Sequence, residues 1–331
     1  RYPLVTGVQT CALPIFRFSL IDSILSTSST STLPTIRVNE AFNAGGAGQM
    51  GDRRAREIEV AQNFDFNAGR KHSMRAGVLF ETGWWNSDQR SNAFGTYTFT
   101  SLAAYQAGKP STYSIRTGDP VVAYTQTKLG YFVQDDFKPS RDLQVSVGVR
   151  HELQTQVEAK WNVAPRAAFT WNATKKSTIR GGYGIFYDWY DSSLYEQTIR
   201  VDGNHQVDVV VQNPAFPVSD TSGVRLPPSV IRAATLTQPT IQQASVGLER
   251  PLASWADLRT DYMWTRGSRT LRSVNANAPV NGVRPNPLVG NITEVQSSGK
   301  RASAILGQVS RTIQEVPRPL LTVDECLRMP G

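Results

Sequence analysis

The sequence contains very little cysteine and no long hydrophobic run. Its two cysteines, Cys11 and Cys326, lie near opposite ends of the chain, and the body from Phe16 to Gly299 has none. A disulfide framework or a thiolate metal site in the body is therefore excluded. The longest apolar runs, such as Val209–Val211, fall far short of the roughly 18 residues that a membrane-spanning helix requires. If the chain meets a bilayer, it must do so as a closed β-barrel, because only helices and barrels satisfy every backbone group in lipid.

Motifs for catalysis and metal binding are missing as well. The three histidines, His72, His151 and His205, lie far apart with no HxxxH or HxH spacing, so a metal site would need side chains from distant segments. No GxSxG or HExxH motif occurs, so neither of these hydrolase signatures is present. The glycine-rich Gly181–Gly184 lies inside an alternating segment, where glycine more often relieves crowding at a bend of a barrel than cradles phosphate. We therefore predict no enzymatic activity and no cofactor.

The basic net charge of +8 first suggests nucleic-acid binding. Arg1 contributes +1 and residues 300–331 contribute +2 to this charge, and both segments differ in character from the rest of the chain. The remaining +5 is spread thinly, without a cluster of Lys and Arg that could follow a phosphate backbone. We therefore expect no nucleic acid among the partners.

Both ends of the chain differ from its middle. Within residues 1–15, the run Val5–Ile15 matches one translated frame of a common sequencing-library adapter, and we expect this segment to be non-native. After about Gly299 the alternation stops, and the tail 300–331 weakly resembles the C-terminal stretch of conjugative coupling ATPases. We expect this tail to be atypical, either through a chimeric join or as an ordinary divergent loop, which leaves 16–299 as the candidate domain.

Alternation of apolar and polar residues is the main structural signal. In Leu143–Thr155 one face carries mostly Leu and Val, and the other carries Gln, Ser, Arg and Glu, a period of two that indicates a β-strand. A barrel strand needs roughly nine to eleven residues to cross the hydrocarbon layer at a tilt, so the length of this segment favours a membrane barrel over a sandwich. The same pattern predicts strands at 57–67, 72–84, 96–101, 124–137, 166–173, 177–189, 242–250 and 255–265.

The connections between the predicted strands fall into two classes. Lys138–Asp142 and Asn172–Ser177 are tight, whereas Asp202–Pro239 and Arg269–Asn291 are long and rich in Pro, Gly and Asn. Short turns at one rim and long loops at the other are typical of outer-membrane barrels. Aromatic residues also gather at strand ends, which suits a girdle at the membrane interface, although they could instead fill a sandwich core. The girdle candidates are Trp84, Tyr187, Trp189, Tyr262 and Trp264.

Two consecutive segments carry a resemblance to a known family. Leu129–Phe137 (LGYFVQDDF) and Leu143–Arg150 (LQVSVGVR) look like the paired strands of TonB-dependent receptors. Further segments continue the resemblance in the expected order, at 162–171, 178–188, 243–250 and 277–279. The chain is most similar to the Oar-like receptors, which carry a carboxypeptidase-regulatory-like domain ahead of the plug, and the resemblance covers roughly residues 33–299.

The resemblance implies a fold, a location and partners. Members of this family hold a plug domain inside a barrel of about 22 strands in the bacterial outer membrane. They import large or scarce solutes with energy relayed by TonB. About a dozen predicted strands, without a plug or a TonB-binding segment, indicate an all-β, antiparallel up-and-down meander that forms an incomplete barrel and is not competent alone. The expected partners are outer-membrane lipid and, in the full-length receptor, TonB and an unidentified solute.

The polar faces of the predicted strands hold the candidate functional residues. In a barrel the charged side chains of these faces would line the lumen, and the candidates are Arg150, Glu152, Arg180, Asp188, Asp257, Arg259 and Asp261. They could hold a plug or contact a solute, or they could simply pair with cross-strand neighbours and water.

Two other classes of protein stay open on the sequence alone. A secreted or surface-exposed structural or adhesive β-protein would show strands of about five to seven residues and no aromatic girdle. A soluble carbohydrate-acting enzyme would need two carboxylates that converge on one site. Asp188 and Asp261 are candidates for such a pair.

Overall fold

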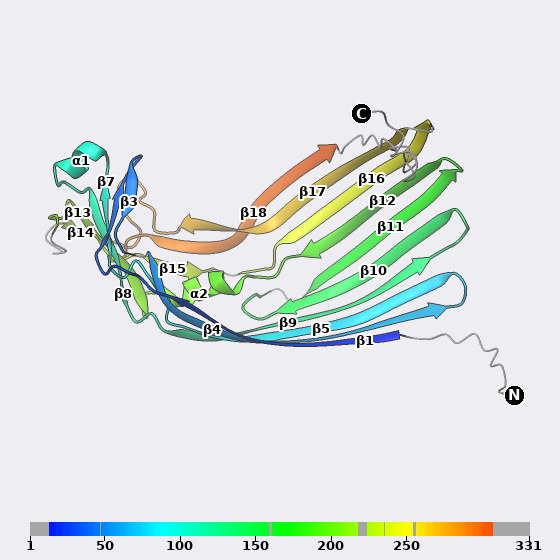
Figure 1. Cartoon of the computed structure of the whole chain (residues 1–331), viewed down its shortest axis with the longest axis horizontal. Helices are drawn as coiled ribbons and strands as arrows, with labels where there is room; N and C mark the ends of the chain where they lie inside the picture. Colours follow the sequence, from blue (N-terminus) through cyan, green and yellow to red (C-terminus); the bar gives the residue numbers. More distant parts are fainter. Residues whose placement is uncertain are drawn as a thin grey trace, which may run out of the picture.

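A strongly curved antiparallel sheet makes up most of the structure (Figure 1). The computed structural model describes residues 13–46, 48–158, 161–217, 224–234, 236–253 and 256–306. The long strands of the sheet are, in spatial order, β1 (Leu13–Thr27), β4 (Gln49–Ala68), β5 (His72–Ser87), β9 (Val122–Phe137), β10 (Leu143–Gln154), β11 (Asn162–Thr174), β12 (Ser177–Tyr187), β16 (Thr240–Ala253), β17 (Ala256–Asn275) and β18 (Ile292–Leu306). Within the described residues the sheet does not close on itself, because β1 forms one edge and short β15 (Val230–Ala233) beside β18 forms the other. The predicted all-β, up-and-down meander with an open edge is confirmed.

Alternation along each strand gives the sheet two chemically different faces. The register aligns Val60, Phe80 and Leu129 in one row across β4, β5 and β9, so the apolar positions of neighbouring strands share a face. Many of their side chains are 39% to 50% exposed, among them Val78, Phe80, Val133, Val147, Val149, Phe169, Tyr183 and Val246. An exposed apolar surface that extends over this many strands is unusual for a soluble monomer and typical of the lipid-facing side of a barrel.

Connections of two lengths lie at the two ends of the long strands. The β4–β5, β9–β10 and β11–β12 connections are short turns at 69–71, 138–142 and 175–176, and Gly69 supplies the positive φ, +72°, in the first of them. The long connections, at 28–48, 88–121, 188–239 and 276–291, all lie at the opposite end (Figure 1). The predicted division into short and long connections is confirmed, although the last long connection starts later than predicted because β17 continues to Asn275.

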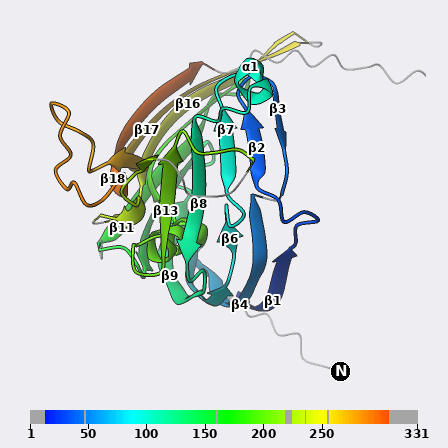
Figure 2. The ribbon, with the colours of Figure 1, turned by 90° about the vertical axis from the view of Figure 1, so that its left-hand side faces the viewer.

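The long connections fold into a second, smaller sheet at their end of the molecule (Figure 2). Its strands are β14 (Val224–Arg225), β13 (Gln206–Gln212), β8 (Thr112–Gly118), β7 (Thr96–Phe99), β2 (Thr35–Val38) and β3 (Phe42–Ala44). One face packs against α1 (Leu102–Gln106) and Phe216, around the buried Val38, Tyr97, Phe99, Tyr113 and Val211. The Phe216 ring lies edge-on to Tyr97 and Phe99, with centroids 5.2 Å and 5.1 Å apart. Three separate connections therefore share one hydrophobic core.

Two predictions about these connections were wrong. The segment 96–101 contains the predicted strand, β7, but this strand belongs to the small sheet and not to the barrel. The segment 202–239 was expected to be a loop, but it contributes β13, β14 and β15. The remaining short elements are β6 (Arg90–Ser91), which pairs with β4, and α2 (Ser192–Arg200). No helix in the described ranges has the length and apolar character needed to cross a membrane.

The two outermost strands of the large sheet cross the sequence-based boundaries of the candidate domain. β1 begins at Leu13, inside the adapter-like segment, and pairs with β4 over its whole length. β18 continues beyond Gly299 to Leu306, after shifts of register opposite Thr270 and Leu271. Neither strand was predicted, because β1 is apolar on both faces and the second half of β18 has no alternation. The expected boundaries at 16 and 299 stay predictions.

The small sheet should unfold locally when its core is emptied. Phe99 has no exposed surface, so Phe99→Ala should destabilise the small sheet by about 3–5 kcal/mol and leave the long strands in place. Hydrogen exchange measured by mass spectrometry should show faster exchange in β7, β8 and β13 and no change in β10. Thr98→Ala, on the opposite face of the same strand, is the matched control. Equal exchange in the two variants would show that this cluster does not hold the small sheet together.

Candidate functional site

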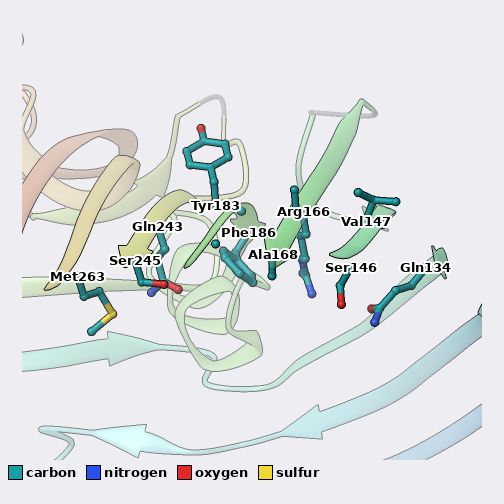
Figure 3. Close-up of a pocket in the computed structure, with 14 residues that line it drawn as sticks. Gln134, Ser146, Val147, Arg166, Ala168, Tyr183, Phe186, Gln243, Ser245 and Met263 are labelled. Atoms are coloured by element: carbon teal, nitrogen blue, oxygen red, sulfur yellow. The ribbon is translucent and has the colours of Figure 1, made fainter. Parts of the chain in front are cut away.

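The concave face of the large sheet carries the charged residues that the sequence pattern selected. Arg150 pairs with Phe132 and Ala164 on the neighbouring strands, and Asp261 and Arg180 both align with Gly247. Because side chains alternate along a strand, these positions lie opposite the exposed apolar ones. Figure 3 shows this division, with Gln134, Ser146, Arg166, Gln243 and Ser245 extending to one side and Val147 and Tyr183 to the other.

Most of these charged side chains pair with one another along the concave face of the large sheet, which is called the wall below. The Arg150 Nε lies 2.5 Å from Glu152 Oε1, within one strand. The Arg180 guanidinium lies 3.4 Å from Asp261 and 3.8 Å from Glu249, and Arg259 lies 2.9 Å from the other Glu249 oxygen. Further pairs on the same face are Lys128–Glu81, Arg75–Asp65 and Arg17–Glu59. The face is therefore highly polar, and most of its charge is balanced locally.

Asp188 and Asp257 are placed differently from the other candidates. Asp188 is exposed beyond the end of β12, where its backbone N–H donates to the Pro239 carbonyl at 3.0 Å. Asp257 pairs in register with Pro251 near the short-turn end. Asp188 and Asp261 do not converge, because the positions that face them are Pro239 and Gly247. These two positions lie about eight residues apart, or roughly 26 Å at 3.3 Å per residue. The structure therefore gives no support to a glycosidase pair made of these two carboxylates.

A shallow hollow of about 470 Å³ lies on the concave face and extends from β9 to β17 (Figure 3). Glycines make room for rings on both faces of the sheet here. In the hollow, a Cβ at Gly184 would lie 2.9 Å from the Phe186 ring, and on the outward face a Cβ at Gly181 would lie 2.7 Å from the Phe169 ring. This agrees with the expectation that these glycines relieve crowding. The guanidinium of Arg166 lies in the hollow, 4.3 Å from the centroid of Phe186. Arg166 was not among the predicted residues, because only its placement beside the ring distinguishes it from other strand arginines.

The segment 188–200 folds inward and binds the concave wall near the long-loop end. The Tyr190 carbonyl accepts hydrogen bonds from the side-chain amides of Gln126 on β9, at 3.1 Å, and Gln154 on β10, at 2.8 Å. The Tyr190 N–H donates back to Gln154 at 2.7 Å. The helix α2 follows, capped at its N-terminus by Asp191, which accepts from the backbone N–H groups of Ser193 and Leu194. The wall therefore fixes both the entry to the helix and its direction.

A buried ionic cluster fixes α2 itself. The Glu196 carboxylate, 3% exposed, accepts from Arg53 Nε on β4 at 2.9 Å and from Arg200 at 2.6 Å. It also accepts from the hydroxyl of Tyr124 on β9 at 3.0 Å. Arg200, 1% exposed, donates to Ser87 Oγ and to the Pro120 carbonyl. Burial alone would raise the pKa of Glu196, but the hydrogen bonds from Arg53, Ser87 and Arg200 and the Arg200 charge hold it below its usual value.

The sequence reasoning missed this inward helix. The Asp191-Ser-Ser cap and the i,i+4 pair Glu196–Arg200 were the available signals. They lie in a stretch that is too short for its helical period to stand out. Arg116 on β8 links the same helix to the small sheet, since it binds Asp208 at 2.7 Å and lies 3.5 Å from the Gln197 side chain. The long connections, the helix and the wall therefore form one continuous structure at this end.

The predicted girdle residues do not all share one face. Trp84 and Tyr262, 44% and 43% exposed, lie on the apolar outward face, and Tyr187 and Trp264 share its register. Trp189 lies beyond the end of β12, and its ring lies 5.9 Å from the Nζ of Lys128, a residue of the concave face. Four of the five residues therefore lie on the outward face, and Trp189 lies at the long-loop end of the concave face. Their place at a membrane interface stays a prediction.

The comparisons with known proteins agree with this architecture. A family model described as "Outer membrane beta barrel domain" matches residues 12–162 and 155–304. The chain therefore belongs to the outer-membrane β-barrel family, and its long strands form part of a wall in the outer membrane.

Solved structures with the same fold are outer-membrane proteins of known type. The outer membrane transporter YddB from Escherichia coli matches with a TM-score of 0.56 and 14% identity over 88% of this chain and 36% of that chain. The siderophore receptor PirA from Acinetobacter baumannii matches with a TM-score of 0.53 and 10% identity. A variant of the ferric enterobactin receptor PfeA from Pseudomonas aeruginosa, in complex with enterobactin, matches equally well. For both receptors 88% of this chain and 38% of the other are covered, so this chain spans little more than a third of their length.

A short stretch of the chain has a different relative. Over 38 residues it is 71% identical to the conjugal transfer protein TraG of Escherichia coli, which is 12% of this chain and 6% of that protein.

The attachment of α2 should weaken in acid. The lowered pKa of Glu196 means that its ionised form stabilises the attachment fully above about pH 4.5, the usual value for a glutamate. This contribution is lost as the pH falls through the lower pKa of the folded state. Glu196→Gln should mimic acid at neutral pH and weaken the attachment by about 3 kcal/mol, because Arg53 and Arg200 lose their carboxylate.

Hydrogen exchange of 188–200, corrected for intrinsic rates, measures this effect. We expect faster exchange in Glu196→Gln at pH 7 and in the unmodified chain below pH 4.5. Glu158→Gln, at an exposed site, should exchange like the unmodified chain. If both variants protect α2 equally, the ionic cluster does not hold the helix.

Proposed function

We propose that this chain is part of the barrel of a TonB-dependent import receptor of the Oar-like branch, not competent alone, and that the full-length receptor takes up a large or scarce solute through the outer membrane. The observation that carries the proposal is the arrangement of the long connections. They build a small sheet at one mouth of a wide curved wall and send α2 into that mouth. A solute arriving from the long-loop side would meet these elements first.

The concave face supports a role in handling a polar solute or a polar plug. Its arginine and carboxylate pairs are partly exposed, and the hollow beside Arg166 is open. We propose that Arg150, Glu152, Arg180, Asp257, Arg259 and Asp261 line the lumen of the complete barrel, with Asp188 at its mouth. The likeness to a siderophore receptor and to a ferric enterobactin receptor makes an iron-chelate a reasonable first solute to test. In the full-length receptor TonB supplies the energy, and the proposal assigns no catalytic residue and no cofactor.

The full-length gene tests the proposal through solute uptake. Deletion of the gene from its source strain should abolish uptake of the labelled solute, and a protonophore should abolish uptake in the parent strain, because import depends on energy from the inner membrane. Ferric enterobactin is the first probe, followed by other iron-chelates. Normal uptake together with reduced attachment of the deletion strain to surfaces would instead support a surface-exposed adhesive protein.

We also propose that the chain has a composite origin, with residues 1–15 derived from an adapter and residues 300–331 from a second gene. The adapter match of Val5–Ile15 supports the first part. The 38-residue likeness to TraG supports a second source for some part of the chain. Long-read sequencing of the source DNA should replace both segments with receptor sequence. Native DNA that encodes both segments unchanged would contradict this proposal without affecting the uptake test.

A further inference from the structure

A polar hollow of about 450 Å³ lies on one face of the small sheet. The register brings its side chains together in two rows across β2, β3, β7 and β8. The polar side chains that these strands contribute are Asn43, Arg37 and Thr98 in one row and Thr35, Thr96 and Ser114 in the next. Sites for small molecules have volumes of roughly 300–1,000 Å³, so the hollow is large enough for one.

This face of the small sheet is turned towards the mouth of the wall. Side chains alternate along a strand, so Arg116, two residues beyond Ser114 on β8, belongs to the same face. The Arg116 guanidinium lies 3.5 Å from the Gln197 side chain of α2, which is bound to the wall. The hydrophobic core with α1 and Phe216 occupies the opposite face. Figure 2 shows the small sheet in front of the large one when the molecule is viewed from the long-loop end. A solute that enters the mouth therefore meets the polar face.

The hydroxyl groups of the hollow are held in place and can still bind a ligand. The Thr96 hydroxyl donates to Asn92 Oδ1 at 2.7 Å, and the Asn92 amide donates to the Ser114 hydroxyl at 3.2 Å. The Thr35 hydroxyl donates to the Gly46 carbonyl at 3.1 Å. Each of these hydroxyl oxygens keeps at least one lone pair, and Ser114 also keeps its proton. The hollow can therefore exchange several hydrogen bonds with the hydroxyl groups of a carbohydrate.

Arg37 supplies the charge of the hollow. Within the described residues its guanidinium forms no ion pair and donates no hydrogen bond, and no carboxylate lines the hollow. Glu40, the nearest acid along the chain, lies on the β2–β3 turn outside the hollow. Asp208, an acid on the same face, is already paired with Arg116 through two hydrogen bonds of 2.7 Å and 2.9 Å. The Arg37 guanidinium is therefore available to an anionic ligand.

The charge of Arg37 fits a carboxylate better than a phosphate. A guanidinium binds a carboxylate through two parallel hydrogen bonds. One guanidinium balances the single charge of a carboxylate, whereas a phosphate monoester carries about −1.5 to −2 at neutral pH.

We propose that this hollow binds an acidic sugar unit of the imported solute, such as a uronate. Arg37 binds the carboxylate, and Thr98, Asn43 and Ser114 exchange hydrogen bonds with the ring hydroxyls. A sugar fits this site better than an aromatic chelate, because in the described part of the chain no aromatic or aliphatic side chain lines the hollow. The proposal rests on the proposed import function, because the hollow faces the mouth through which the solute would enter.

Isothermal titration calorimetry of the full chain, refolded in detergent micelles, tests the hollow with two probes. Tetragalacturonate carries the carboxylates, and its full methyl ester keeps every hydroxyl group and loses the charge. The acid should bind about tenfold more tightly than the ester, because a hydrogen bond to a charged group contributes about this factor. Arg37→Gln should remove the tenfold difference and leave the affinity for the ester unchanged. Arg141→Gln, in an exposed turn at the opposite end, is the matched control and should retain the difference.

Three results would overturn the proposal. Equal affinity of acid and ester for the unmodified chain would contradict the carboxylate contact, and this comparison holds even if Arg37→Gln does not fold. An equal loss of both ligands in Arg37→Gln would assign Arg37 a structural role instead. Failure of the folded, unmodified chain to bind either probe at millimolar concentration would remove the inference and leave the uptake test of the full-length gene unaffected. Intact binding without energy-dependent uptake would count against import and would leave the hollow as a sugar site.

Discussion

The antiparallel register of the long strands is the constraint on which the other features depend. It closes the backbone hydrogen bonds of the wall from strand to strand, which lipid requires because it offers no partner to an open N–H or carbonyl group. It also decides which residues face inward, since a shift by one position would exchange the two faces of a strand. The row Val60–Phe80–Leu129 faces outward, and Arg180 and Asp261 face inward beside Gly247, because unbroken pairing extends across these strands.

The mouth at the long-loop end is organised by a different kind of interaction. The outward face is stabilised by the lipid around it, whereas α2 is held by charged groups that would be costly to bury without partners. Glu196 accepts hydrogen bonds from Arg53, Arg200 and Tyr124, and Arg200 also donates to Ser87. Such clusters are specific in geometry, because each charge needs all of its partners in place. The small sheet uses aromatic packing around Phe99 and Phe216 instead. The wall, the helix and the small sheet thus rely on three separate sources of stability.

Much of the wall could be predicted from the sequence, and little of the mouth. The strand at Leu143–Thr155 was predicted almost to the residue. A strand with one apolar and one polar face has apolar and polar residues at alternate positions, and this pattern is visible in the sequence. β1 was missed because apolar residues occupy both of its faces. In the small sheet, only β7 was predicted as a strand, at 96–101. The other strands of the small sheet are two to seven residues long and come from three connections, so no sustained alternation marks them. The alternating pattern placed Arg150 and Arg180 on the polar face of their strands, which is the concave face of the sheet. Arg166, Arg53 and Glu196 instead depend on contacts between distant segments that a single sequence does not record.

The short parallel pairing of β15 with the first residues of β18 adds a third anchor to the connection between β12 and β16. That connection is already fixed at α2 on the wall and at β13 in the small sheet. A connection that is fixed at three points consists of several short loops. The entropic cost of closing each loop depends only on the length of that loop. Residues inserted between two fixed points therefore lengthen a single loop, which costs little entropy, and leave the contacts at both fixed points in place. Sequence drift during evolution is accordingly best tolerated between the anchors, for example at 202–205, so the surface of this mouth can diversify while its framework persists.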